Sequence, residues 1–139
     1  MQTTPLNYYL LSNATYVTDN SGHSKLLDEI ARSPSSIGIT EPAETYMEVR
    51  LVDGGKTKGK VDVVVLTQSD LYLIEAKTFK RGRNDKTTAN QWARMFSQLQ
   101  TAQRYFAEHF EASPRLIGVL KRKGSKEFHH HELTELLKK

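Results

Sequence analysis

The sequence predicts an α/β fold in which a central mixed β-sheet is flanked by helices, and three observations indicate it. Residues 59–66 and 71–77 form two apolar runs that are separated by the short turn 67–70, as in a β-hairpin. A long amphipathic segment, which Thr87 or Thr88 could cap, then extends to about Glu111. The apolar run 115–120 follows it, and a strand–helix–strand crossover favours parallel pairing of the two strands.

The remaining elements follow from local patterns. Residues 6–11 are an apolar run that predicts a strand or a docking turn. Ser24 is the expected N-cap of a short helix that ends at the Ser-Pro-Ser-Ser segment 33–36. Apolar and charged residues alternate over 44–52, which predicts a strand, and Asp-Gly-Gly at 53–55 indicates a hairpin. Residues 128–137 predict a final strand or a short helix.

Three ionisable residues interrupt the two central strands: Asp62, Glu75 and Lys77. A buried charge costs several kcal/mol unless it is paired or binds a metal. Side chains alternate along a strand, so Glu75 and Lys77 share a face. A tight hairpin places Asp62 opposite them. The pattern therefore predicts a site for a hard divalent cation beside a lysine. The alternative is a structural salt bridge between Lys77 and the two acids.

The same residues resemble a known signature. Asp62, twelve intervening residues and then Glu75-Ala76-Lys77 are similar to the motif of the PD-(D/E)XK nuclease superfamily. Val61 stands where many members have proline. The resemblance covers about residues 24–120. It implies a restriction-endonuclease-like core of the order αβββαβ and a metal-dependent hydrolysis of phosphodiester bonds, with DNA as the expected substrate.

The resemblance also implies roles for individual residues. Asp62, Glu75 and the backbone carbonyl of Ala76 would hold Mg²⁺ or Mn²⁺. An acid from an upstream element would assist them, with Glu29 as the first candidate and Asp28 and Glu48 as alternatives. Lys77 would orient or deprotonate the attacking water, and Gln98 on the long helix would position the lysine or the water. His23 either assists a proton transfer or is an exposed turn residue.

Basic residues around the expected site are candidates for phosphate contacts, because cations near a cleavage site can hold a polyanionic backbone. They are Lys58, Lys60, Lys80, Arg81, Arg83, Arg94, Lys121 and Arg122. The alternative is a solvated surface. The net charge of +4 permits phosphate binding without requiring it.

Composition narrows the class of protein. The chain of 139 residues predicts a single domain over 1–139. It has no cysteine, which excludes disulfides, iron–sulfur clusters and thiolate zinc sites. No apolar run approaches the roughly 20 residues of a membrane span, and a signal-peptide pattern is absent, so the cytoplasm is the expected compartment. The consecutive His129–His131 do not share a face, which argues against a three-histidine metal site.

Two further interpretations stay open at this point. One is a non-catalytic nucleic-acid-binding or assembly protein on the same fold. The other is an unrelated α/β scaffold with a structural bridge. For a nuclease, the sequence leaves open duplex or branched DNA and endo- or exonuclease action. A homodimer would let a core of this size cut both strands.

Overall fold

The computed structural model describes residues 5–15, 21–79, 85–122, 126 and 128–133. Its helices are α1 (Leu6–Asn13), α2 (Gly22–Arg32) and α3 (Asp85–Phe110), with a short 3₁₀ turn, η1, at Pro34–Ile37. Its strands are β1 (Ala43–Asp53), β2 (Lys56–Thr67), β3 (Leu71–Phe79), β4 (Arg115–Arg122) and β5 (Phe128–Glu132).

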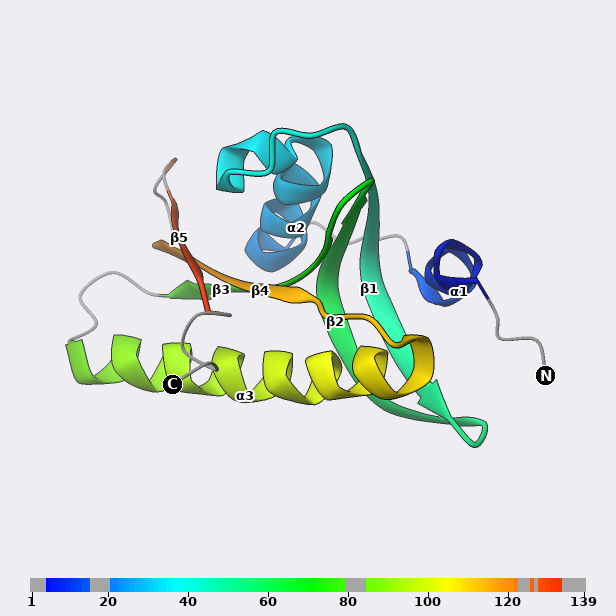
Figure 1. Ribbon diagram of the computed structural model, residues 1–139. Coiled ribbons are helices and arrows are strands. Elements are labelled where there is room, and N and C mark those ends of the chain that lie inside the picture. Colours follow the sequence, from blue (N-terminus) through cyan, green and yellow to red (C-terminus); the bar gives the residue numbers. More distant parts are fainter. Residues whose placement is uncertain (1–4, 16–20, 80–84, 123–125, 127, 134–139) are drawn as a thin grey trace.

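The five strands form one mixed sheet in the order β1-β2-β3-β4-β5. The pairs β1/β2, β2/β3 and β4/β5 are antiparallel, whereas β3 and β4 are parallel. The predicted crossover is thus confirmed. Figure 1 shows α2 on one face of the sheet and the long α3 on the other, with α1 beside β1. The predicted α/β architecture, a central mixed sheet flanked by helices, is therefore present.

Two apolar clusters hold the layers together. On one face, α3 buries Leu99 and Phe106 against strand residues such as Leu73. On the other, α2 buries Leu26 and Ile30 against the second set of strand side chains. The central run of β2 is buried on both faces, as β-branched residues in an inner strand predict. At Gly118 a β-carbon would lie 2.6 Å from the Trp92 ring, so glycine is needed for α3 to pack this closely.

Two predictions near the N-terminus were wrong. Residues 6–11 belong to helix α1, not to a strand. Tyr9 of α1 packs against Phe106 and donates its hydroxyl hydrogen to the Arg50 carbonyl of β1 (2.7 Å). The N-cap of α2 is Ser21, whose hydroxyl accepts from the Ser24 amide. Ser24 itself lies inside the helix and is buried.

The β1–β2 hairpin is closed by Gly54 and Gly55, both with positive φ, which is the conformation that a tight two-residue turn requires. The pairing register shifts by one residue between Leu51 and Val52. This bulge interrupts the simple alternation of the lysines on β2. The final segment is strand β5, as one of the two alternatives predicted. In the part of the chain that the structure describes, no helix has the length and apolar character needed to cross a membrane.

Candidate metal centre

The candidate site lies where β2 and β3 separate. Their ladder runs from Leu66–Leu71 to Val63–Ile74, and the next two opposed positions are Asp62 and Glu75. Beyond this point β2 continues with β1, whereas β3 continues with β4 to Phe79. Figure 1 shows the two pairs of strands diverging. We call this point the fork.

At the fork, side chains replace the backbone ladder. The Asp62 amide donates to Glu75 Oε1 (3.4 Å), and the Ala76 amide donates to Asp62 Oδ2 (2.9 Å). Each carboxylate therefore satisfies a backbone amide of the opposite strand. Both acids are buried, with exposed fractions of 6% for Asp62 and 4% for Glu75. The prediction that these two residues meet at one end of the hairpin is confirmed.

Burial and proximity shift the pKa values of the two acids in opposite directions. Burial, reinforced by the negative charge of Asp62, raises the pKa of Glu75. Burial also acts to raise the pKa of Asp62, but hydrogen bonds from His23 and from the Ala76 amide outweigh it and hold that pKa below its ordinary value. Two neighbouring carboxylates cannot both ionise cheaply. Asp62 is thus the ionised member, and Glu75 keeps its proton.

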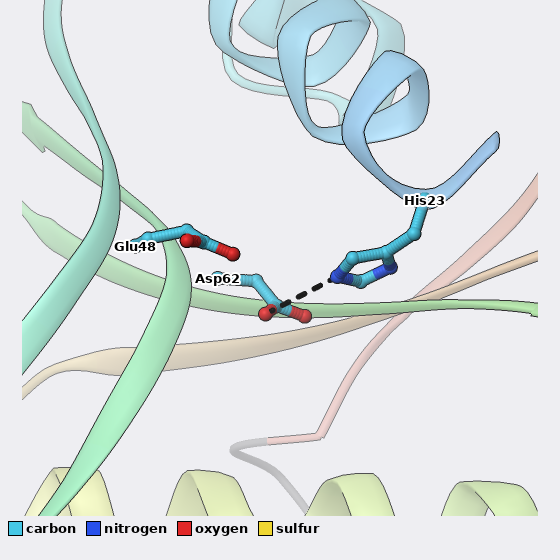
Figure 2. A group of neighbouring side chains, drawn as sticks. All are labelled: His23, Glu48 and Asp62. Atoms are coloured by element: carbon cyan, nitrogen blue, oxygen red, sulfur yellow. Dashed lines mark ion pairs between the residues drawn. The ribbon is translucent and has the colours of Figure 1, made fainter. Parts of the chain in front are cut away.

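His23 reaches Asp62 from the first turn of α2. Its Nε2 lies 3.6 Å from Asp62 Oδ1 (Figure 2). The hydrogen bond to Asp62 raises the pKa of His23 and outweighs the opposing effect of burial. His23 is therefore not a simple exposed turn residue, because it contacts the fork directly, and its assistance in a proton transfer stays a prediction.

Glu48 completes a group of three potential metal ligands with His23 and Asp62. One ligand atom of each residue lies within 4.8 Å of the others, and Figure 2 shows the three side chains converging from α2, β1 and β2. Glu48 faces Asp62 across the β1–β2 ladder, between the pairs Met47–Val63 and Val49–Val61. Its φ of 46° lies in the left-handed region, which costs a non-glycine residue about 1–3 kcal/mol. This conformation interrupts regular pairing at the position where Glu48 joins the group.

The acid that the structure brings next to Asp62 is therefore Glu48, one of the two alternatives, and not Glu29. The Glu29 carboxylate lies 3.9 Å from Lys121 Nζ. Asp28 is paired with Arg32 at 2.9 Å, one helical turn away. Neither acid belongs to the group around Asp62. Of the predicted carboxylates, the two on α2 are thus paired elsewhere, whereas Glu48 on β1 lies beside Asp62.

Lys77 follows Glu75 on β3 and is half-buried. Its positive charge acts on both Glu75 and His23 and partly opposes the rise in the pKa of each. Within the described residues it forms no ion pair with Asp62 or Glu75. The predicted proximity of the three charges is supported, but the structural alternative, a bridge from Lys77 to both acids, is not formed. Ala76 borders the fork through its amide, and its carbonyl stays a predicted ligand.

Two glutamines of α3 differ in their surroundings. Gln98 is exposed on α3, next to the buried Leu99. Gln91 instead lies on the helical stripe that continues through Met95 and Leu99 towards the sheet. Its Oε1 is buried and has no hydrogen-bond partner among the described residues. The role of Gln98 at the site stays a prediction.

The predicted phosphate-binding residues are dispersed. Lys58 and Lys60 are exposed on β2, and Lys60 Nζ lies 3.2 Å from Glu48 Oε1. Arg94 is exposed on α3, and Arg122 is exposed at the end of β4, after the half-buried Lys121. The loop candidates Lys80, Arg81 and Arg83 lie outside the described residues.

No protein-family model matches the chain, and no curated protein gives a significant match.

Proposed function

We propose that this protein is a metal-dependent nuclease that hydrolyses phosphodiester bonds, with DNA as its expected substrate, on a restriction-endonuclease-like αβββαβ core. One observation carries the proposal. Two buried carboxylates meet at the fork, and a histidine and a third carboxylate adjoin them at the surface. Buried acids are costly, and neither Asp62 nor Glu75 has a lysine or arginine partner among the described residues, which favours a site that binds a cation.

The donor set fits a divalent metal. His23 offers an imidazole nitrogen, and Glu48 and Asp62 offer carboxylate oxygens. Carboxylates suit Mg²⁺ and Mn²⁺, and an added imidazole favours a first-row transition metal such as Mn²⁺. A bound ion would lower the pKa of a coordinated water and offset negative charge on the phosphorane. Glu75 and the Ala76 carbonyl are further candidate ligands.

The chain's own residues would perform the remaining work. Lys77 lies close enough to the fork to influence Glu75 and His23, so its ammonium can orient the attacking water or stabilise the phosphorane. In the metal-free protein His23 can hold a proton at Nε2, the atom that faces Asp62. Lys58 and Lys60 on β2 offer charge for flanking phosphates.

A non-catalytic nucleic-acid-binding protein on the same fold is the second candidate. Asp62 and Glu75 already satisfy backbone amides, so both could persist as structural parts of the fork while exposed lysines bind the nucleic acid. Binding without cleavage would then be the complete activity.

The deciding experiment is nicking of supercoiled plasmid and of branched DNA with Mg²⁺ or Mn²⁺. We expect cleavage that requires the metal and falls about 10²–10⁴-fold in Lys77→Ala, the range for loss of a group that assists proton transfer. Lys25→Ala, at an exposed position on α2, removes a lysine away from the fork and should cut at the wild-type rate.

DNA binding without cleavage under any of these conditions would favour the second candidate. Equal rates in wild type and Lys77→Ala would contradict the role of Lys77. Calorimetric titration of Mn²⁺ into the wild type and into Asp62→Asn would test separately whether the fork binds metal.

A further inference from the structure

The face of the β1–β2 hairpin opposite α3 carries an unusual arrangement of charge. Val49 and Leu51 are buried in the cluster on the α3 side, so Arg50, between them, points to the opposite face. Arg50 and Lys60 are direct partners in the β1–β2 register and share that face, which is also the face of α2. Both side chains are exposed.

Like charges directly opposite one another destabilise a sheet. Lys60 is offset by Glu48, whose Oε1 lies 3.2 Å from Lys60 Nζ. Arg50 forms no ion pair within the described residues, and Lys58 is exposed at the adjoining bulge. The arrangement therefore has spare positive charge two residues from Asp62, and an anion would relieve the repulsion.

Glu48 links this basic face to the metal group. Its carboxylate is the partner of Lys60 and also a member of the group with His23 and Asp62. A bound cation would therefore compete with Lys60 for the Glu48 carboxylate. Occupation of the group by a metal would leave Lys60 without its counter-charge.

We propose that Lys60 is a metal-released phosphate ligand. Without metal it is held by Glu48. When a divalent cation binds to His23, Glu48 and Asp62, the Lys60 ammonium turns to a phosphate of the nucleic-acid strand beside the cleavage site. This inference rests on the proposed metal centre. It implies that metal and nucleic acid increase each other's affinity, because a coupling between two binding events is reciprocal.

The first test needs no metal. Glu48→Gln removes the charge that holds Lys60, so in the presence of a chelator it should bind a labelled single-stranded oligonucleotide with one more phosphate contact than the wild type. The slope of log K against log salt, measured by fluorescence anisotropy, should steepen by about 0.7. Adding Lys60→Met should abolish this gain. Glu108→Gln, an exposed acid on α3, controls for the change in net charge.

A gain of the same size in Glu108→Gln, or one that persists with Lys60→Met, would overturn the exchange between Glu48 and phosphate. So would a slope that does not change in Glu48→Gln.

The second test adds Mn²⁺ in a Lys77→Ala background, in which cleavage is slow enough for binding to be measured first. Mn²⁺ should steepen the salt slope, and Lys60→Met should reduce this effect by about 0.7, the equivalent of one contact. Lys58→Met, at the exposed neighbouring position, should keep the full Mn²⁺ effect although its affinity is lower.

The outcomes separate the two proposals. If the wild type cleaves and binds Mn²⁺ but Lys60→Met keeps the full Mn²⁺ effect, the nuclease stands and the released lysine is wrong. If Mn²⁺ does not bind, the metal centre and the metal-linked exchange both fail.

Discussion

Two charged clusters of the same sheet are built in opposite ways. At Tyr72–Arg115 in the β3–β4 register, the Arg115 guanidinium donates two hydrogen bonds to Glu132 (2.6 and 2.7 Å) and one to the Tyr72 hydroxyl (3.1 Å). Asp70 lies 3.6 Å from the same guanidinium. Three positions further along β3, at Glu75, buried acids accumulate without an ion-paired lysine.

The difference shows what a structural bridge in this sheet looks like. The Arg115 cluster is partly exposed, and its cation contacts both acids. The fork is buried, its Glu75 has no ion pair among the described residues, and it includes a residue in a left-handed conformation. Natural sequences tolerate such local conflicts mainly at functional sites. We therefore interpret the fork as functional and the Arg115 cluster as structural.

The largest expected effect concerns activity. Asp62→Asn should lower the rate of DNA nicking with Mn²⁺ by more than about 10²-fold, because it removes a ligand charge from the metal group. Asp70→Asn makes the same chemical change in the Arg115 cluster and should leave the rate of the folded protein unchanged. Initial rates at saturating Mn²⁺ measure both, and equal losses would end the distinction between the two clusters.

The next effect concerns stability and has opposite signs in the two regions. Glu75→Gln should raise the metal-free free energy of unfolding by about 2 kcal/mol at neutral pH, because burial and Asp62 disfavour the ionised form of Glu75. Glu132→Gln should lower it by about 1 kcal/mol, because a charged pair with Arg115 is lost. Urea unfolding in the presence of a chelator measures both changes.

Glu75 and His23 also set the pH dependence of the free energy of unfolding. The folded-state pKa of Glu75 is raised above its ordinary 4.5, so above that pH the folded protein binds a proton that the unfolded chain has released. Stability therefore falls as pH rises, until the raised pKa is passed. The raised pKa of His23 adds stability that is fully present below 6.5 and lost as pH rises through its folded value.

Metal-free unfolding at about pH 5.5 and about pH 8.5 should thus show lower wild-type stability at the higher pH. Glu75→Gln should flatten this dependence. The lowered pKa of Asp62 contributes stability above 3.8 that is lost on acidification, outside this range. A wild-type protein that gains stability over the interval would contradict the assignment of the proton to Glu75.

The smallest effect concerns the backbone of Glu48. Glu48→Gly and Glu48→Ala both remove the carboxylate, but only glycine accepts a φ of 46° without strain. The glycine variant should be more stable than the alanine variant by about 1 kcal/mol. Glu111 after α3, with a φ of 53°, is the matched control, because Glu111→Gly should stabilise similarly over Glu111→Ala and leave cleavage unchanged.

The sequence was sufficient to predict those features that depend on the geometry of neighbouring elements. Strand alternation and a short turn brought Asp62 and Glu75 together, since both depend only on the hairpin. The parallel pairing of β3 and β4 followed from the crossover through α3. These parts of the fold require no knowledge of how distant elements pack.

The sequence was insufficient to predict side-chain positions that depend on how distant elements pack. His23 joins the site because α2 docks with its first turn above Asp62, and neither residue encodes that angle locally. Glu48 depends on a left-handed conformation that an alternating strand pattern does not reveal. The exposure of Gln98 depends on the rotation of α3 about its axis, which is set by contacts with the sheet such as Trp92 on Gly118.

The segment around α1 has a consequence for association. The Tyr9 hydroxyl bonds to the Arg50 carbonyl, and the Thr15 amide donates to the Met47 carbonyl (2.8 Å), so backbone acceptors of the outer strand β1 are occupied on both sides of Glu48. An exposed sheet edge is a template on which another chain can add a strand. Helix α1 and Thr15 therefore shield the flank nearest the fork from edge-to-edge aggregation.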